Sequence, residues 1–420
     1  MLEGAFQVFD RRLRPDIAVP IGVAFSGGGD SLLTLKTACA WAARHERPVI
    51  AFHVDHRLQA GGGAWARTAR AASARLGARF IELSWDGDKP ATGLPAAARA
   101  ARHRLIAEAA RDAGARVVVF GHTADDRIEA GLMRDAGLRM GDLREWSPSP
   151  VWPEGRGVFC LRPLLSARRA AIRDLLAAQG ETWIDDPMNQ DPRSPRARAR
   201  PAASMAPSLS QSEDDGGLAR LAALATFGPG GGISLARSAL RTAERGVARR
   251  LIGAACVCAG GAPGPGRRDR IEAMTERLVR LNDVVGTLSG AKVIASDTVL
   301  FIRDAGEARR GGLAPLHLAP GQTGIWDGRF EITAAAAPVL VAGLAGHAGS
   351  LDRDQRRRLK SLPASIRPGL PLIIPKDGAP TCPILAEGPI LAEGSGVEVR
   401  PLVAERFAAA CGVISKEPAV

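Results

Sequence analysis

The sequence predicts an α/β protein in which an N-terminal doubly wound parallel sheet is followed by a mainly helical domain and a small α+β domain. Three observations support this fold class. Short β-rich runs alternate with long Ala/Leu/Arg segments from residue 17 onward, a Pro/Ser/Ala stretch at 201–217 ends that alternation, and short strands with many Pro and Gly turns follow residue 290. A length of 420 residues suits about three domains. We expect them at 1–215, 216–310 and 311–420.

The first domain contains four predicted strands and four predicted helices in alternation. The strands are expected at 21–25, 48–54, 79–83 and 116–120. The helices are expected at 31–45, 62–76, 94–113 and 123–135. Strands of this apolar character are buried on both faces of a parallel sheet, and ligands bind beyond their carboxyl ends. After the linker, the sequence predicts helices over 218–280, β structure at 290–303, and a mixture of short strands and turns thereafter.

The charge balance favours a polyanionic partner such as nucleic acid. The chain has 56 basic and 44 acidic residues and a formal net charge of +12. Only six of the basic residues are lysines, however, and tyrosine is absent. In so arginine-rich a chain, a single arginine is weak evidence of anion binding.

The composition also excludes several classes of protein. A hydrophobic content of 46% argues against an intrinsically disordered chain. The start of the sequence does not resemble a signal peptide, and the longest apolar run, 332–346, is too short to span a membrane. Six scattered cysteines suit free thiols in a reducing compartment, without the spacing of a zinc site. We therefore expect a cytoplasmic protein with no membrane partner.

The strongest motif is a glycine-rich loop between the first predicted strand and the first predicted helix. Its residues are Ser26, Gly27, Gly28, Gly29, Asp30 and Ser31. Backbone N–H groups at a helix N-terminus bind phosphate, and glycines permit the close approach. Asp30 either holds a magnesium ion on the phosphates or caps the helix. An ordinary Gly-rich turn is the alternative, but the strand before the loop, the two serines and the aspartate disfavour it. The loop has neither the Gly-Lys-Ser/Thr of a P-loop nor the G-x-G-x-x-G pattern.

Polar residues also follow the second and fourth predicted strands. Asp55 and His56 follow the second, while the fourth is followed by His122, Asp125, Asp126 and Glu129. Three carboxylates in a cleft can hold a metal or the ammonium group of an amino acid, although helix N-capping is the alternative for any one of them. Arg99 and Arg102 share a helix face and suit a phosphate or carboxylate, with accidental placement as the alternative.

These motifs together resemble one family. The loop is similar to the S-G-G-x-D-S loop of the N-type ATP pyrophosphatases. Five further elements are similar, in the same order, to those of the tRNA(Ile)-lysidine synthases: 53–58 (HVDHRL), 98–103 (ARAARH), 121–129 (GHTADDRIE), 161–165 (LRPLL), and 186–191 (DPMNQD) followed by Arg196, Arg198 and Arg200. His103, Arg127 and Ala197 depart from the residues usual in that family, so the contacts of the closing segment are the least transferable.

The resemblance implies a Rossmann-like ATP pyrophosphatase fold and a two-step reaction. ATP, with Mg²⁺, adenylates the C2 oxygen of the wobble cytidine of a CAU-anticodon tRNA(Ile). L-lysine then displaces AMP to give lysidine, so that the tRNA reads AUA. The loop 26–31 would hold pyrophosphate, Asp30 the metal, and Arg102 the phosphoryl charge. Asp126 and Glu129 would bind lysine, and Asp55 would meet the cytidine. His122, Asp125, Arg99, Arg196 and Arg198 complete the expected substrate contacts.

Some alternatives remain open at this point. Asp55, Asp126 and His122 are equal candidates for accepting the proton of the lysine amine. A basic run at 353–360 is either a tRNA contact or a solvated helix. Rival functions are a tRNA thiolation enzyme of the same superfamily, disfavoured by the absence of a C-x-x-C motif, and a catalytically dead tRNA-binding protein. The oligomeric state is also open, with a homodimer as one option.

Overall fold

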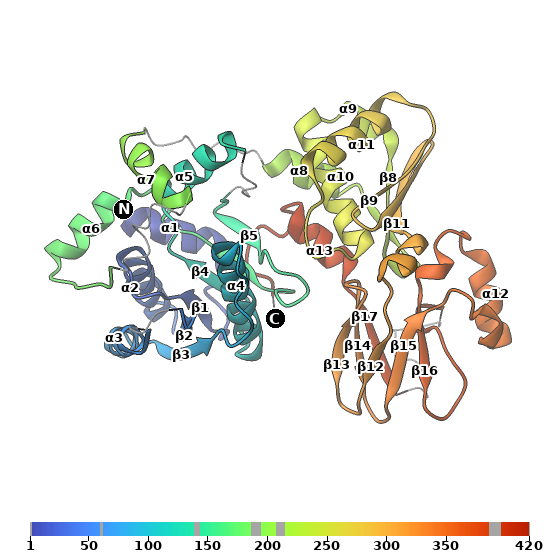
Figure 1. Cartoon of the computed structure of the whole chain (residues 1–420), viewed down its shortest axis with the longest axis horizontal. Helices are drawn as coiled ribbons and strands as arrows, with labels where there is room; N and C mark the ends of the chain where they lie inside the picture. The colour runs from blue at the N-terminus through green and yellow to red at the C-terminus, as the bar shows by residue number, and fades with distance from the viewer. Residues whose placement is uncertain are drawn as a thin grey trace. The chain divides into compact units, whose positions relative to one another are not determined.

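The computed structural model describes residues 2–58, 62–137, 143–185, 195–206, 215–385 and 396–419 (Figure 1). The chain divides into two compact units. The first comprises residues 1–213 together with 414–420, and the second comprises residues 214–413. The division near 213 lies close to the expected end of the first domain. The expected boundary at 310/311 stays a prediction.

A six-stranded sheet forms the centre of the first unit. Its order is β3-β2-β1-β4-β6-β5, with all neighbours parallel except β5 and β6. The strands are β1 (Ile21–Ala24), β2 (Val49–Asp55), β3 (Arg79–Ser84), β4 (Val117–Phe120), β5 (Trp146–Pro148) and β6 (Phe159–Leu161). The predicted parallel sheet is confirmed, because the β-rich runs identified in the sequence are the buried strands.

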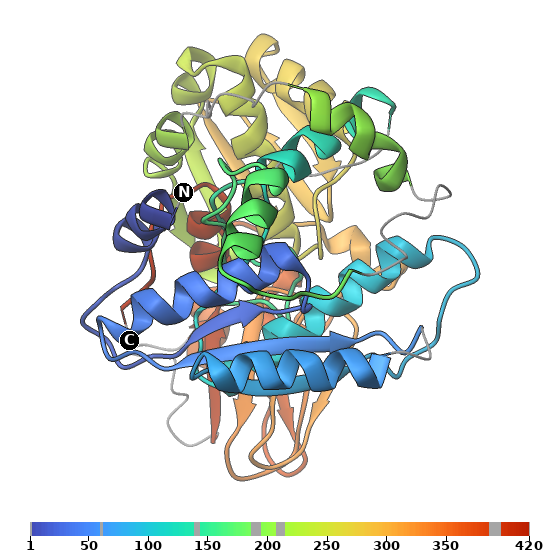
Figure 2. The ribbon, with the colours of Figure 1, turned by 90° about the vertical axis from the view of Figure 1, so that its left-hand side faces the viewer.

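Helices lie on both faces of this sheet, as a doubly wound fold requires (Figures 1 and 2). They are α1 (Leu2–Arg12), α2 (Gly29–Ala43), α3 (Gly62–Arg75), α4 (Leu94–Asp112), α5 (Ala124–Asp135), α6 (Arg169–Ala178) and α7 (Pro195–Met205). Ile106 and Ala110 of α4 join Phe52 and Phe120 of the sheet in one apolar cluster. Burial of this apolar surface holds the helix on the sheet.

The order of the strands decides where a ligand can bind. β1 lies between β2 and β4, so the chain winds outward in one direction from β1 to β3 and in the other from β4. The loops after β1 and β4 therefore diverge at a topological switch point, which is where open parallel sheets bind their ligands. Both loops carry motifs identified in the sequence.

The end of the chain belongs to the first unit. Glu417 forms a two-pronged ion pair with Arg47, at 2.7 and 2.9 Å, and neither side chain is exposed. Trp146 donates to the carbonyl oxygen of Ile414, and Arg12 donates to that of Ser415. These contacts attach the segment from Ile414 to Glu417 to the first unit, across 268 to 403 positions of the sequence. The expectation that 311–420 forms one domain did not foresee this attachment.

The second unit begins with a five-stranded antiparallel sheet of order β7-β8-β11-β10-β9. The strands are β7 (Thr226–Gly228), β8 (Gly232–Ala236), β9 (Val284–Leu288), β10 (Ala291–Ala295) and β11 (Thr298–Arg303). The helices are α8 (Asp215–Ala222), α9 (Arg237–Thr242), α10 (Arg245–Gly260) and α11 (Arg268–Arg280). β7 and β8 interrupt the helical stretch expected over 218–280. These short, glycine-flanked strands pair with each other, and β8 also pairs with β11, a partner distant in sequence.

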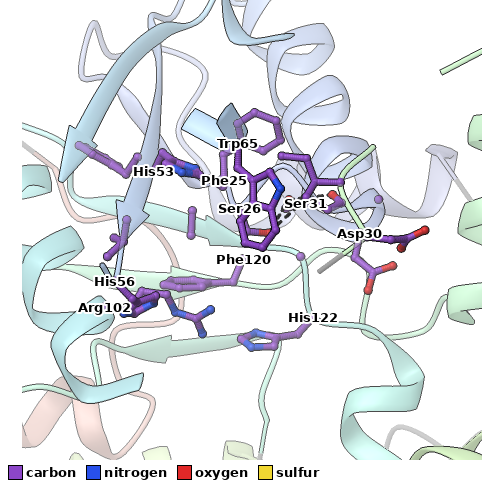
Figure 3. A pocket seen from close by; sticks show the side chains of 18 of the residues that line it. Phe25, Ser26, Asp30, Ser31, His53, His56, Trp65, Arg102, Phe120 and His122 are labelled. Carbon is purple, nitrogen blue, oxygen red and sulfur yellow. Dashed lines mark hydrogen bonds between the residues drawn. The ribbon is translucent and has the colours of Figure 1, made fainter. Parts of the chain in front are cut away.

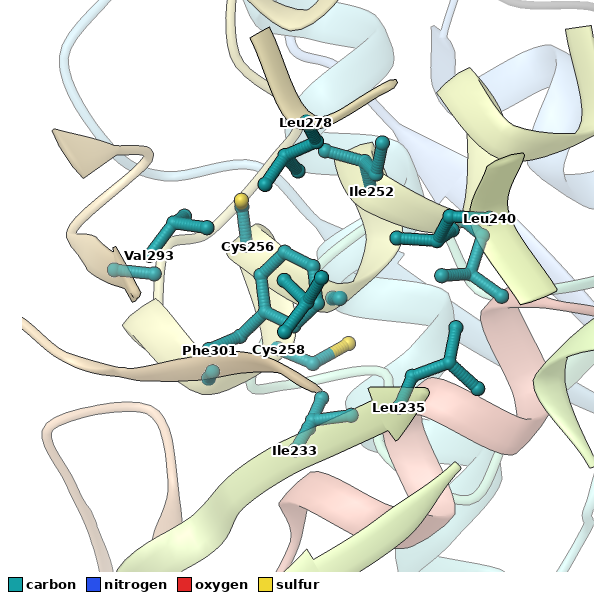
Figure 4. Close-up of a cluster of buried hydrophobic side chains, with 14 of the residues drawn as sticks. Ile233, Leu235, Leu240, Ile252, Cys256, Cys258, Leu278, Val293 and Phe301 are labelled. Carbon is teal, nitrogen blue, oxygen red and sulfur yellow. The ribbon is translucent and has the colours of Figure 1, made fainter. Parts of the chain in front are cut away.

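The apolar core of this sheet contains three of the six cysteines, Cys256, Cys258 and Cys411. Cys256 and Cys258 lie on α10 among Leu235, Val293 and Phe301 (Figure 4). Both are essentially inaccessible, and burial raises the pKa of the Cys258 thiol to about 12. All six cysteines lie in described parts of the chain, and none is in a disulfide.

The rest of the second unit consists of two three-stranded antiparallel sheets, β12-β15-β16 and β13-β14-β17. The strands are β12 (Leu316–Leu318), β13 (Thr323–Trp326), β14 (Phe330–Ala334), β15 (Val339–Gly343), β16 (Pro371–Pro375) and β17 (Val397–Pro401). Residues from all six strands share one apolar cluster. The helices are α12 (Arg353–Ser361) and α13 (Val403–Ala410). Among the described residues, no helix has the length and apolar character needed to cross a membrane.

Candidate functional site

A cavity of about 460 Å³ lies at the carboxyl ends of β1, β2 and β4. It is lined by the loop after β1, by Asp55 and His56 after β2, and by Arg102 from α4. His122 and Asp126, from the junction of β4 and α5, line it as well. Figure 3 shows these elements converging on one space. Motifs separated by about a hundred residues in the sequence are thus brought to one site by the strand order.

The glycine-rich loop is shaped by close packing at Gly27. This residue has φ +86°, in the left-handed region that favours glycine, and a Cβ atom at this position would lie 2.5 Å from Cδ1 of Ile184. The backbone N–H of Ile184 donates to the carbonyl oxygen of Gly27 at 2.9 Å. Ser31 Oγ donates to the Gly28 carbonyl oxygen at 2.8 Å and lies 3.1 Å from Ser26 Oγ. The loop therefore leads directly into the N-terminus of α2, a geometry suited to an anion.

A tight turn orients Asp55 after β2. Its Oδ1 atom accepts a hydrogen bond of 2.8 Å from the backbone N–H of Arg57, which has a φ of 51°. A non-glycine residue in this conformation is uncommon and is found at functional sites more often than elsewhere. Beside it, burial and the charge of Arg102 lower the pKa of His56. His56 is accordingly neutral near pH 7.

The acidic residues of the site converge on one arginine. The guanidinium of Arg169, at the start of α6, lies 3.0 Å from carboxylate oxygens of both Asp126 and Glu129. Its Nε atom lies 3.2 Å from Oδ2 of Asp30. The backbone N–H of Arg169 also donates to Asp125 at 2.8 Å. A cationic side chain therefore already balances the carboxylates that the sequence assigned to cation binding.

Asp126 both caps a helix and faces a cation, which are the two roles that the sequence left open for it. Its Oδ2 accepts hydrogen bonds from the backbone N–H of Thr123 at 2.6 Å and from the Thr123 hydroxyl at 2.9 Å, which completes a capping box at α5. Its Oδ1 faces Arg169. One oxygen therefore fixes the start of the helix, while the other is directed at a cation.

Asp30 is a partly buried carboxylate whose pKa is shifted. Burial raises its pKa, and the positive charge of Arg169 opposes this shift without cancelling it. A carboxylate that is costly to bury becomes more favourable when a ligand brings positive charge, which is the behaviour expected of a metal ligand. No group of three or more His, Cys, Asp or Glu among the described residues is arranged to hold a metal by itself. Asp30 could therefore contribute only part of a coordination sphere, with phosphate oxygens supplying the rest.

The predicted site residues fall into four groups. The cavity is lined by Ser26, Gly28, Gly29, Asp30, Ser31, Asp55, Arg102, His122 and Asp126. Gly27, Asp125 and Glu129 contact lining residues or their neighbours. Arg99 and Arg198 are not among the lining residues, and Arg198 is exposed. The segment 186–191 and the side chain of Arg196 lie outside the described residues.

Sequence reasoning missed several residues of the cavity. Arg169 and Arg173 from α6 and Trp65 from α3 line it. Arg200, which belongs to the closing motif of the sequence, lines it as well. Arg169 follows the R-P-L-L element by only a few residues, and this closeness to a family motif could have marked it as a site residue. Arg169 could not be distinguished from the many other arginines of the chain.

The chain is similar in sequence to known proteins. A family model described as the PP-loop domain matches residues 6–205. A tRNA(Ile)-lysidine synthase of Caulobacter vibrioides is 47% identical over 409 residues, which cover 97% of each chain. That of Hyphomonas neptunium is 34% identical over 304 residues, covering 68% of this chain and 81% of the relative. The solved structure of the U34-tRNA thiolase NcsA from Methanococcus maripaludis aligns with a TM-score of 0.40 and 15% identity, over 48% of this chain and 71% of that one.

Proposed function

The chain belongs to the tRNA(Ile)-lysidine synthase family, and we propose that it ligates L-lysine to C2 of the wobble cytidine of a CAU-anticodon tRNA(Ile). The observation that carries this proposal is that the phosphate-type loop and Asp126 line one cavity. ATP bound at the loop and lysine bound at Asp126 would both lie next to a cytidine that enters the same cavity. The same location beyond a parallel sheet is where such ligands bind in related folds.

The proposed reaction has two steps. The C2 oxygen of cytosine attacks the α-phosphorus of ATP, a P–O bond forms, and pyrophosphate leaves. The neutral ε-amine of lysine then attacks C2, the C–O bond breaks, and AMP departs with that oxygen while the amine loses a proton. Adenylation is needed because the carbonyl oxygen of a urea-like group is a poor leaving group. ATP is thus converted to AMP and pyrophosphate for each C–N bond formed.

The loop at 26–31 and Arg102 are the proposed ATP contacts. Backbone N–H groups at the N-terminus of α2 and the hydroxyl groups of Ser26 and Ser31 would bind the pyrophosphate. Arg102 would balance the charge that develops on the α-phosphoryl group. Asp30 and the phosphates suit Mg²⁺, which usually takes one or two carboxylates together with substrate oxygens. When bound, the ion would neutralise the charge of the departing pyrophosphate.

Asp126 and Glu129 are the proposed lysine contacts. Arg169 holds both carboxylates in position. These carboxylates hold a guanidinium at 3.0 Å. Their positions are therefore set for a cationic nitrogen before any substrate arrives. An ammonium group of lysine would share these oxygens with Arg169 or exchange with it. Asp55, fixed by the turn at Arg57, would meet the cytidine.

The exposed arginines are the proposed tRNA contacts. Arg198 lies on α7 in the first unit, and a basic run occupies α12 in the second. On α12, the side chain of Arg357 is 75% exposed. Arginines of this kind bind the nucleic-acid backbone without reading sequence. We expect them to contribute affinity that weakens with salt.

The two rival functions make different demands on the site. Thiolation enzymes usually need paired cysteines, yet none of the cysteines is among the residues that line the cavity. Cys256 and Cys258 are enclosed in an apolar core, where a thiol is unreactive. A dead tRNA-binding protein would have no need for the loop and the acidic residues in one cavity.

Release of pyrophosphate from ATP tests the proposal against the dead binding protein, and incorporation of labelled lysine into the tRNA tests it against thiolation. We expect release that requires both the purified chain and CAU-anticodon tRNA(Ile), and no incorporation of sulfur into that tRNA. A catalytically dead protein would release no pyrophosphate above background. A thiolation enzyme would release it and leave the tRNA without lysine.

A further inference from the structure

The hydrogen bond between Arg162 and His122 determines how the histidine can act. Arg162 follows β6, and its Nε–H donates to Nδ1 of His122 at 3.1 Å. Both residues are buried, with relative exposures of 5% and 8%. An arginine side chain has only donors and no acceptor. The Nδ1 atom of His122 must therefore be the unprotonated nitrogen.

The surroundings of Arg162 hold its guanidinium in one orientation. Nη1 donates to the carbonyl oxygen of Arg144 at 2.8 Å and to Oγ of Ser147 at 3.0 Å. The guanidinium also lies 5.8 Å from the ring centroid of Phe120, whose ring stacks on that of His122. Since the guanidinium is tied to three groups, rotation away from His122 would break several hydrogen bonds at once. The contact with Nδ1 is therefore a fixed part of the fold.

A neutral histidine that accepts at Nδ1 carries its proton on Nε2. His122 lines the cavity together with Arg102 and Asp126. Acceptance of a second proton would place an imidazolium beside a guanidinium and remove their hydrogen bond, which opposes use of this ring as a base.

We infer that His122 is a fixed hydrogen-bond donor toward an oxygen atom of the reacting substrates, and not the base that takes the proton of the lysine amine. This inference rests on the proposed function for its substrate and on the contact with Arg162 for its chemistry. Phosphoryl and carbonyl oxygens are the acceptors that the proposed reaction provides. Arg162 is the positioning residue, because it sets the tautomer without touching the substrate.

The remaining candidates for the base are then Asp55 and Asp126. Both oxygens of Asp126 already accept hydrogen bonds, from Thr123 and from Arg169. Asp55 accepts one from the backbone of Arg57 at Oδ1. With His122 assigned as a donor, the three candidates for the base that takes the proton of the lysine amine are reduced to two.

The tautomer can be measured directly in the full-length chain without any substrate. We would label histidine with ¹⁵N and record two-bond ¹H–¹⁵N correlations at pH 7. The His122 signals would be assigned from their absence in His122→Gln. His317→Gln, on an exposed position of β12, controls for general perturbation. We expect the pattern of a neutral ring protonated at Nε2, and a ring protonated at Nδ1 or doubly protonated would overturn the inference.

Activity provides the second readout, since Gln can place an N–H near the position of Nε2 but cannot act as a base. Loss of one preorganised donor costs about 10²–10³-fold in turnover, and loss of a general base costs about 10²–10⁴-fold. We expect His122→Ala to fall in the first range and His122→Gln to recover most of that loss. A Gln variant no more active than Ala would overturn the donor role. If the wild-type chain transferred no lysine, the proposed function would fail, while the tautomer would still be decided by the spectrum.

Discussion

The Nη2 atom of Arg169 lies 3.0 Å from Oδ1 of Asp126, so the residue that we expect to bind lysine is already paired with a cation. The same guanidinium contacts Glu129 and Asp30. Burial opposes the charge of Arg169, yet Asp126 and Glu129 more than compensate and raise its pKa. Arg169 therefore offsets part of the negative charge of these three carboxylates.

Replacement of Arg169 by Met should destabilise the first unit. The change leaves three carboxylates without their shared cation, and loss of one partner from a buried ion pair typically costs about 3–5 kcal/mol. Because 18% of the side chain is exposed, we expect about 2–3 kcal/mol at pH 7 in urea unfolding, and less at pH 5. Arg173→Met, in an exposed pair with Asp185, should change stability by less than about 0.5 kcal/mol. Equal effects for the two variants would refute the balancing role.

Asp30→Asn should stabilise the protein and lower its turnover. Because burial raises the pKa of Asp30 above its unfolded value, this carboxyl favours folding at low pH, and its contribution is lost as the pH rises through the folded pKa. Near pH 7 the ionised group therefore costs stability that Asn does not. We expect a higher melting temperature than wild type at pH 7 and a smaller difference at pH 4. Turnover should fall at least about 10²-fold if Asp30 helps to bind the metal–ATP complex. A lower melting temperature at pH 7 would contradict this account.

Gly27→Ala should weaken ATP binding through the shape of the loop. A side chain at a positive φ costs about 1–2 kcal/mol, and the new Cβ would also collide with Ile184. Gly77 has φ +75° and no atom within 4 Å of the place where a Cβ would lie, so Gly77→Ala isolates the conformational cost. We expect similar strain in both variants, a larger loss of stability for Gly27→Ala, and weaker ATP binding by calorimetry only for that variant. Unchanged ATP affinity in Gly27→Ala would count against the loop as the nucleotide site.

Glu417→Gln should destabilise the first unit even though it lies near the end of the chain. The substitution leaves Arg47 as a buried charge without its counter-ion, for which about 3–5 kcal/mol is the usual cost. Asp269→Asn removes an exposed pair with Arg267 and should leave the stability nearly unchanged. Urea unfolding monitored by tryptophan fluorescence compares the two. A loss below about 1 kcal/mol for Glu417→Gln would mean that the attachment is dispensable.

The parts of the fold that could be predicted from sequence are those set by local pattern. The strand from Ile21 and the helix that follows the glycine-rich loop are encoded by apolar runs and turn residues close together in the chain. The strands β7 and β8 were not foreseen. β8 pairs with β11, whose residues lie about 65 positions away in the sequence. The ion pair of Arg47 and Glu417 spans 370 positions and has no local pattern at all.

In the candidate site, too, residues in local motifs could be predicted, and residues that act through distant contacts could not. Asp126 could be identified because loop, strand end and acidic cluster occur in a recognisable order. Arg169 could not, since one arginine among so many carries little information until its three carboxylate contacts are seen. The hydrogen bond from Arg162 to His122 likewise depends on the adjacency of β4 and β6, which places two separate motifs together.

Lysine transfer to the wobble cytidine tests the central claim most directly. Purified chain, ATP, labelled lysine and CAU-anticodon tRNA(Ile) would be incubated, and the digested nucleosides analysed by mass spectrometry. We predict a cytidine derivative that carries one lysine, formed with one AMP released per lysine attached. Asp126→Asn should lose this product while ATP binding stays nearly intact, and Asp135→Asn, at an exposed position of the same helix, should retain it. An unmodified cytidine with the wild-type chain, or undiminished product with Asp126→Asn, would contradict the account.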